Sequence, residues 1–120
     1  MRTDGLAKAF TAGGAIPAHT IIKGHTTAGE VVVGAAATDK VFGVSTEVDA
    51  ATGDRVDVYL PGSIAPVIYG GAIEVGDLLT SDANGHAVAT TTANDRVIGV
   101  AMTAGADNDI GHVCIQVSNL

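Results

Sequence analysis

The chain has 120 residues, 47% of them hydrophobic, with 13 acidic against 6 basic side chains and a formal net charge of −7. This length suits a single domain, and the apolar content excludes a chain that is disordered throughout. With two Tyr, two Phe and no Trp, the core must be built mainly from Val, Ile, Leu and Ala.

The first fifteen residues are small and rich in glycine, and they include Phe10. We interpret residues 1–15 as an arm outside the folded domain, ordered only where a partner holds it. The rest of the chain, residues 16–120, is expected to form one β-domain. No window of ten or more residues has a helical apolar period, so the prediction is an all-β fold.

Short apolar or β-branched runs, bounded by Gly, Asp, Asn and Thr, predict the strands. Two runs alternate cleanly, which indicates one buried and one solvated face. Asn84-Gly85 predicts a hairpin turn between Leu78-Leu79 and a strand near Val88, because both residues tolerate positive φ. The predicted strands are Thr20–Ile22, Val31–Val33, Val56–Leu60, Leu78-Leu79, Arg96–Val100 and Val113–Val117.

Three segments of the first half recur in order in the second half. Ile16–Ile22 aligns with Ile73–Leu79 at an offset of 57, Thr38–Ser45 with Asn94–Ala101 at 56, and Arg55–Leu60 with His112–Val117 at 57. We interpret residues 16–60 and 73–117 as two copies of a four-element β-unit, joined by residues 61–72. Chance similarity between Val-rich strands is the alternative. Two copies are too few for a solenoid, so a small closed, clip-like or tulip-like β-barrel is expected.

Composition and motifs also exclude several functions. The basic residues are scattered and aromatic residues are few, so direct nucleic-acid binding is not expected. The longest uncharged stretch, residues 58–73, contains Pro and Gly and is too short to span a membrane, and no signal peptide is expected. One cysteine, Cys114, cannot form an internal disulfide, which fits synthesis in a reducing cytoplasm.

No group of residues predicts a catalytic site, a metal site or a cofactor. The four histidines, His19, His25, His86 and His112, lack metal-ligand spacing, and the Asp-rich loops lack the calcium-loop pattern. Phosphate-loop and nucleophile-elbow motifs are absent from the sequence. We therefore expect no enzyme activity.

The order Val75-Gly-Asp-Leu-Leu, a turn with glycine, Asp95-Arg-Val-Ile-Gly-Val-Ala and a final alternating strand resembles the capsid cement proteins of tailed bacteriophages. Residues 41–64 are similar to the middle of lambda-type head decoration proteins. The resemblance implies a structural virion protein, made in the host cytoplasm, that stabilises the expanded capsid. It would bind the major capsid protein on the outer surface at junctions between capsomers, commonly as a homo-trimer.

We expect the arm to contact the capsid by adding a strand to an exposed edge of the coat. The expected contact residues are Leu6, Lys8, Phe10 and Thr11. A carbohydrate- or ligand-binding clip-like module is the alternative function, because residues 14–22 are similar to the opening of such domains. That function would need a pocket lined by His19, His25 and Tyr59, although the chain has few aromatic platforms for a sugar.

Overall fold

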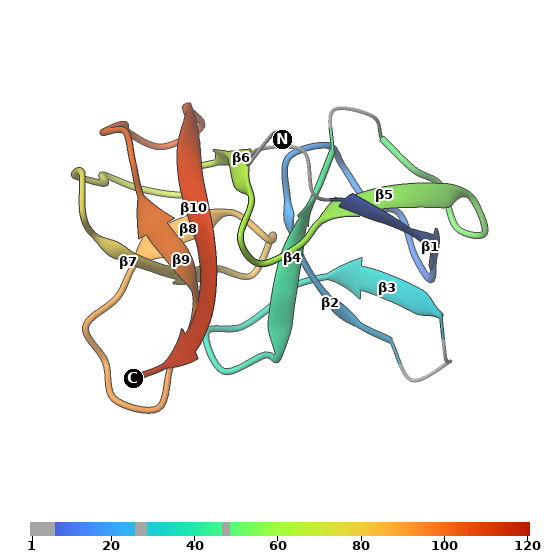
Figure 1. The fold of residues 1–120 in the computed structure, drawn as a ribbon, viewed down its shortest axis with the longest axis horizontal. Coiled ribbons are helices and arrows are strands. Elements are labelled where there is room, and N and C mark those ends of the chain that lie inside the picture. The colour runs from blue at the N-terminus through green and yellow to red at the C-terminus, as the bar shows by residue number, and fades with distance from the viewer. Residues whose placement is uncertain (1–6, 26–28, 47–48) are drawn as a thin grey trace.

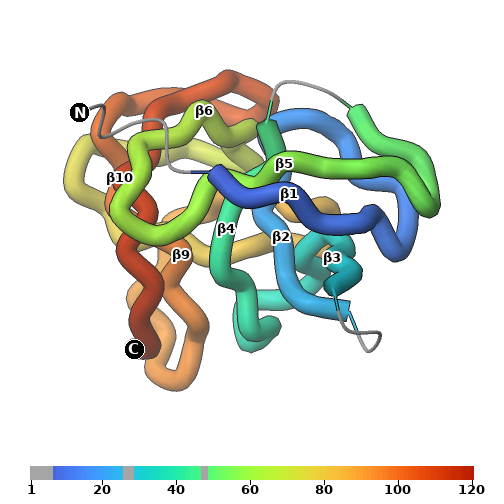
Figure 2. The backbone as a smooth tube through the Cα atoms, turned by 45° about the vertical axis from the view of Figure 1, so that its right-hand side comes forward, coloured from blue at the N-terminus to red at the C-terminus, as the bar shows by residue number. Residues whose placement is uncertain are grey.

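The computed structural model describes residues 7–25, 29–46 and 49–120. These residues form ten strands and no helix, so the part described contains no apolar helix long enough to cross a membrane. Figures 1 and 2 show two β-units side by side, with the chain passing from one to the other once. The strands are β1 (Ala7–Ala12), β2 (Ile21–Gly24), β3 (Glu30–Val33), β4 (Val41–Ser45), β5 (Arg55–Tyr59), β6 (Ile64–Ile68), β7 (Leu78–Ser81), β8 (Ala87–Ala89), β9 (Arg96–Ala101) and β10 (Ile110–Asn119).

The first half, residues 7–60, is a closed barrel with the strand order β1-β3-β2-β4-β5. β1 closes it by pairing in antiparallel with β5 and, through Thr11 and Ala12, in parallel with β3. Closure gives this half a buried core of its own, which we call the first core. The first core consists of Ala12, Ile16, Ile22, Val31, Ala50, Val56 and Val58, with Phe10, Val33 and Phe42 packed against it.

The second half, residues 64–119, is a five-stranded sheet with the order β6-β10-β9-β7-β8. Its core, the second core, also takes in Ile21, Val41 and Val44 from the first half. The first half therefore caps the open side of the second. The residues that the second half supplies are Ala65, Val67, Tyr69, Ile73, Leu79, Ala87, Ile98, Ala101, Val113 and Ile115.

The two halves have the same strand pairing. β2 pairs with β3 and β4, and β4 with β5, as β7 pairs with β8 and β9, and β9 with β10. β1 pairs with β5 as β6 pairs with β10. The parallel pairing of β1 with β3 has its counterpart in a single parallel bridge between Tyr69 and Ala87. Each unit thus has five strands rather than the four expected.

The expected arm and linker each contain the strand that the four-element unit lacked. Residues 7–12 of the expected arm form β1 inside the barrel, and residues 64–68 of the expected linker form β6. The sequence Ala-Lys-Ala-Phe-Thr-Ala of β1 has low β propensity, and partners on both sides hold it extended. β6 contains Pro66, which is tolerated because β6 is an edge strand that pairs only with β10.

The expected alignment of the last strands was wrong by two residues. Ala12 N–H donates to Asp54 O as Tyr69 N–H donates to Asp109 O, at 2.8 and 2.7 Å. The offset is therefore 55 rather than 57, and Val58 rather than Val56 corresponds to Val113. Alternating strands repeat every two residues, so a slip of two leaves the apolar pattern unchanged.

The predicted hairpin at Asn84-Gly85 is confirmed and lies where the halves meet. β7 and β8 pair across this turn, Gly85 has φ of 76°, and Asp82 Oδ1 accepts the N–H of Asn84. Gly85 O in turn accepts Ile21 N–H from the first half at 2.8 Å. The turn thus joins β7 to β8 and also binds Ile21, the first residue of β2.

Candidate functional site

Lys8, Phe10 and Thr11 of β1 are the expected contact residues within the part described, and Leu6 lies outside it. Lys8 and Thr11 are exposed. The Phe10 ring is half-buried and packs edge-on against Phe42, with ring centroids 5.7 Å apart, while Lys8 Nζ lies 5.5 Å from the Phe10 centroid. Phe10 therefore belongs to the barrel wall and also supports an exposed cation.

One edge of β1 is only partly used. β5 pairs with β1 from Ala7 to Thr11, whereas β3 pairs with it only at Thr11 and Ala12. Among the described residues, no strand pairs with the other edge of residues 7–10. Such an edge offers backbone donors and acceptors to another strand.

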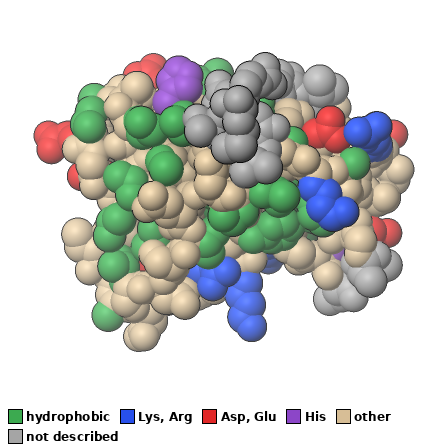
Figure 3. Space-filling view, in the orientation of Figure 1, with side chains coloured by type: hydrophobic (Ala, Val, Ile, Leu, Met, Phe, Trp, Pro, Cys, Tyr) green, Lys and Arg blue, Asp and Glu red, His purple; other side chains and the backbone are tan. Residues whose placement is uncertain are grey.

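The large exposed apolar side chains of the described residues all belong to the second half or the C-terminal residue. In Figure 3 hydrophobic side chains spread over the left half of the face, where Figure 1 shows β7 to β10 of the second half, and over the centre, where it shows β4 and β6. Exposed apolar groups gathered on one unit indicate a surface that contacts a partner. They are Val75, Leu78, Met102, Ile110 and Leu120, with exposed fractions from 37% for Leu78 to 66% for Val75.

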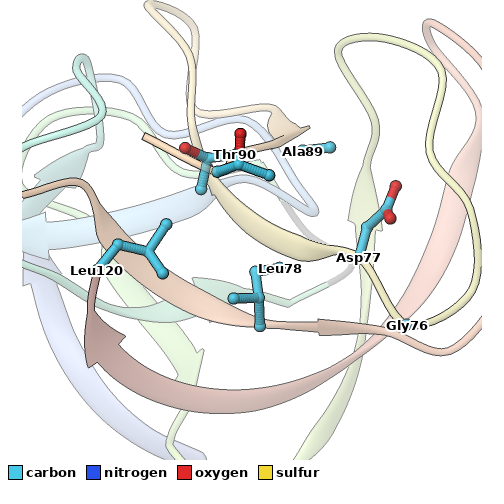
Figure 4. Close-up of a pocket in the computed structure, with 7 residues that line it drawn as sticks. Gly76, Asp77, Leu78, Ala89, Thr90 and Leu120 are labelled. Carbon is cyan, nitrogen blue, oxygen red and sulfur yellow. The ribbon is translucent and has the colours of Figure 1, made fainter. Parts of the chain in front are cut away.

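A groove of about 360 Å³ opens beside Leu78 on this half. Figure 4 shows the lining side chains gathered from β7, from the end of β8 and from the C-terminus. The walls are mostly apolar, with the carboxylate of Asp77 at one end. The groove is lined by Gly76, Asp77, Leu78, Ala89, Thr90, Thr91 and Leu120.

The charges are divided unevenly between the halves. Residues 64–120 carry six acidic side chains and one basic side chain, Arg96. The ion pair between Lys23 and Asp39 lies in the first half, with Nζ to Oδ2 at 2.9 Å. The hydrogen bond from Lys23 holds the pKa of Asp39 below its ordinary value. The second half is thus the more acidic surface.

A protein-family model for phage cement proteins matches residues 11–117, which spans both five-stranded units. The chain belongs to the phage cement protein family. The cement protein is therefore a structural, virion-associated protein that acts with the phage capsid.

The fold of the cement protein is similar to a solved structure from bacteriophage phi29, described as the head fiber gp8.5 N base. The two chains share 24% sequence identity with a TM-score of 0.71, over 96% of this chain and 97% of the other. This likeness supports the all-β barrel fold. A comparison with curated proteins gave no match.

The alternative ligand-binding function was expected to need a pocket lined by His19, His25 and Tyr59. Neither the groove beside Leu78 nor a second groove at Thr46, Arg55, Val56 and Asp57 is lined by His19, His25 or Tyr59. His25 Nδ1 lies 3.2 Å from Glu30 Oε1. Within the described ranges, no three His, Cys, Asp or Glu side chains are placed to hold a metal ion.

Sequence reasoning missed the groove and the exposed apolar side chains of the second half. Leu78 belongs to a predicted strand, and alternation does not say which unit will cover its outer face. One signal was available: Gly-Gly-Ala-Ile occurs at residues 13–16 and again at 70–73, an offset of 57. This repeat extends the two aligned units back to residues 13 and 70, which lie just after β1 and β6.

Proposed function

We propose that this cement protein decorates the outer surface of the expanded phage head at junctions between capsomers and stabilises the shell. The match to the phage cement family along residues 11–117 is the observation that carries this proposal. A binding protein of this kind needs surfaces rather than a chemical centre. The exposed apolar side chains of the second half and the open edge of β1 are two such surfaces.

The negative charge of the protein favours binding to the outer rather than the inner surface of the shell. A net charge of −7, with a strongly acidic second half, repels packaged DNA and keeps the protein soluble outside the head. We further propose that it acts as a homo-trimer. Several weak contacts held in one assembly give tight attachment through a high effective concentration.

We propose that β1 supplies the contact with the major capsid protein. The free edge of residues 7–10 would pair with a coat strand, and Lys8 and Phe10 would give that pairing its specificity. From Thr11 onward, β3 pairs with this edge of β1, so the free edge ends there. Leu6 precedes β1 in the chain and is retained as an expected contact.

Binding to purified expanded heads that lack the cement protein tests the proposal. Co-sedimentation with quantitative mass spectrometry should give saturation at a fixed ratio to the major capsid protein. Electron cryo-microscopy of the saturated heads should place density at junctions between capsomers on the outer surface. Failure to bind, or binding only inside the shell, would contradict the proposed function.

Substitution of the two exposed lysines tests the role of β1. Lys8→Glu should weaken binding to heads by about tenfold or more, since reversing a charge beside a strand contact opposes docking. Lys40→Glu is the matched control, because Lys40 is also exposed in the first half but lies outside β1. Equal binding of the two variants would contradict the assignment of β1.

A further inference from the structure

Asn84 is the asparagine of this chain that a glycine follows, whereas Asn94 and Asn108 precede aspartate and Asn119 precedes leucine. Asparagine loses its side-chain amide when the backbone nitrogen of the next residue attacks the amide carbon. Glycine has no Cβ, so its backbone can approach that carbon with little steric hindrance. The sequence of the turn between β7 and β8 therefore makes Asn84 the most reactive asparagine of the chain.

The folded turn leaves both reacting groups without a strong hydrogen bond. Asn84 is exposed, and the described ranges supply no hydrogen bond to its side-chain amide. Gly85 N–H donates to Asp82 O over 3.3 Å, which is longer than an ordinary N–H···O bond. The shorter bonds of the turn go to Asp82 Oδ1, which accepts the N–H groups of Asn84 and His86 at 2.8 and 2.9 Å. Hydrogen bonding in the turn therefore opposes the attack only weakly.

Gly85 itself is packed tightly at the contact between the two halves. Its carbonyl oxygen accepts Ile21 N–H at 2.8 Å. A Cβ at Gly85 would lie 3.2 Å from Ile21 O and 3.3 Å from Thr20 Cβ, and it would collide with Val33. The space between this turn and the first half is therefore full, and the main chain before Gly85 cannot lengthen without moving that residue.

We propose that Asn84 is a site of spontaneous modification, at which deamidation to isoaspartate weakens the contact between the two halves. The backbone nitrogen of Gly85 gives up its proton to solvent and attacks Cγ of Asn84. The new C–N bond closes a succinimide ring while the bond from Cγ to Nδ2 breaks, and Nδ2 leaves as ammonia with a proton from solvent. Water then opens the ring at either carbonyl, which gives aspartate or isoaspartate. Water is the co-reactant, and no atom is oxidised or reduced.

The two products have different effects on the contact between halves. Aspartate keeps the length of the main chain and adds only a negative charge close to Asp82. In isoaspartate the main chain runs through the former side-chain carbons, which places an additional methylene group before Gly85. Gly85 O then moves away from Ile21 N–H, and the packing of Ile21 in the second core is weakened. Isoaspartate therefore loosens the halves from each other, whereas aspartate leaves them joined.

Incubation of the purified protein at mildly alkaline pH tests where the reaction occurs. Peptide mapping by mass spectrometry follows the conversion of amide to acid at each asparagine, and labelling with an isoaspartyl methyltransferase identifies isoaspartate. Asn84 should react about tenfold faster than Asn108 or more, because the Cβ of Asp109 hinders the same attack. Asn108 is the internal control, since it is also exposed and lies in a turn. Equal rates at the two positions would overturn the inference.

Hydrogen exchange at Ile21 N–H tests the effect on the contact between halves. The isoaspartyl form, isolated by chromatography, should exchange this proton about tenfold faster than the unmodified protein or more, because the bond to Gly85 O is lost. Asn84→Asp is the matched control, since it carries the new charge on a main chain of unchanged length. Its exchange at Ile21 should stay within about twofold of wild type.

Two results would overturn the proposed weakening of the contact. One is an isoaspartyl form that keeps the wild-type protection of Ile21 N–H, and the other is an Asn84→Asp variant that loses this protection to the same extent. Both readouts use the protein without capsids. Failure to bind heads would therefore contradict only the proposed function.

Discussion

The ring of Tyr69 lies directly over the backbone of Gly111, where a side chain would collide with the ring. In the first half the corresponding residues are Ala12 and Val56, which are both buried. The first half thus packs the small Ala12 against the branched Val56. The second half packs the large Tyr69 against Gly111, which has no side chain. The same backbone holds both combinations because the volumes compensate.

We expect Gly111→Val to destabilise the protein strongly, because the ring of Tyr69 is fully buried and its hydroxyl donates to Thr103 O at 2.7 Å. Tyr69→Ala alone should cost about 3–5 kcal/mol of unfolding free energy. The double variant recreates the pair of the first half. It should be more stable than the sum of the single effects predicts, by about 1–3 kcal/mol. Urea unfolding of all four proteins measures this coupling, and strictly additive effects would contradict it.

Gly43 and Gly99 occupy equivalent positions where two strands approach closely. A Cβ at Gly43 would lie 2.5 Å from Tyr59 O, and one at Gly99 would collide with Cys114 O. Because these neighbours are backbone atoms, they cannot rotate away, and alanine at either position should cost about 2–3 kcal/mol. Gly24→Ala in β2 is the control, since nothing lies within 4 Å of its Cβ. Thermal unfolding should leave this variant within about 0.5 kcal/mol of wild type.

Comparing alanine substitutions at Gly85 and Gly29 separates the free-energy cost of backbone strain from the cost of a packing collision. Both have positive φ, so alanine strains the backbone in either turn. Only at Gly85 would the new methyl group also collide with Val33 across the interface between halves. Gly85→Ala should therefore lower the unfolding free energy by about 1–3 kcal/mol more than Gly29→Ala. Chemical unfolding at a concentration where the protein is monomeric is the measurement, and equal losses would mean that the turn is not packed against the first half.

The ion pair of Asp39 should make stability depend on pH in the acid range. Its carboxylate accepts Lys23 Nζ and Ala35 N–H, which lowers its pKa in the folded protein. The unfolded chain therefore takes up a proton near the ordinary pKa of about 3.9, before the folded protein does. The stabilisation is complete above that value and is lost as pH falls through the lower folded-state pKa. Unfolding curves of wild type and Asp39→Asn from about pH 7 to about pH 2 should converge, whereas a constant difference would contradict this.

The strands with β-branched alternation were predictable from the sequence, and β1 and β6 were not. Val56–Tyr59 and Val113–Val117 show their buried face in the residues themselves. β1 is extended because β5 and β3 bind it, and β6 carries a proline that only an edge position permits. The extended conformation of β1 and of β6 depends on pairing with strands distant in sequence, and local propensity gives no information on such pairing.

The candidate surface was harder to predict for a related reason. Ile21 and Leu78 have the same place in the repeat and similar chemistry, yet one is buried and the other exposed. Ile21 is buried because it packs into the core of the second half and binds the turn of hairpin β7–β8. The expected contacts Lys8 and Phe10 lie on one strand, with Lys8 Nζ over the Phe10 ring and that ring edge-on to Phe42.

The first core uses residues of the first half alone, whereas the second core uses residues of both halves, and this difference bears on the order of folding. The first half closes on itself around the first core, so it can condense while the rest is still being made. The second core needs Ile21, Val41 and Val44, which the first half presents only once β2 and β4 are paired. We therefore expect the C-terminal unit to order against the N-terminal unit, so that folding would follow the direction of synthesis.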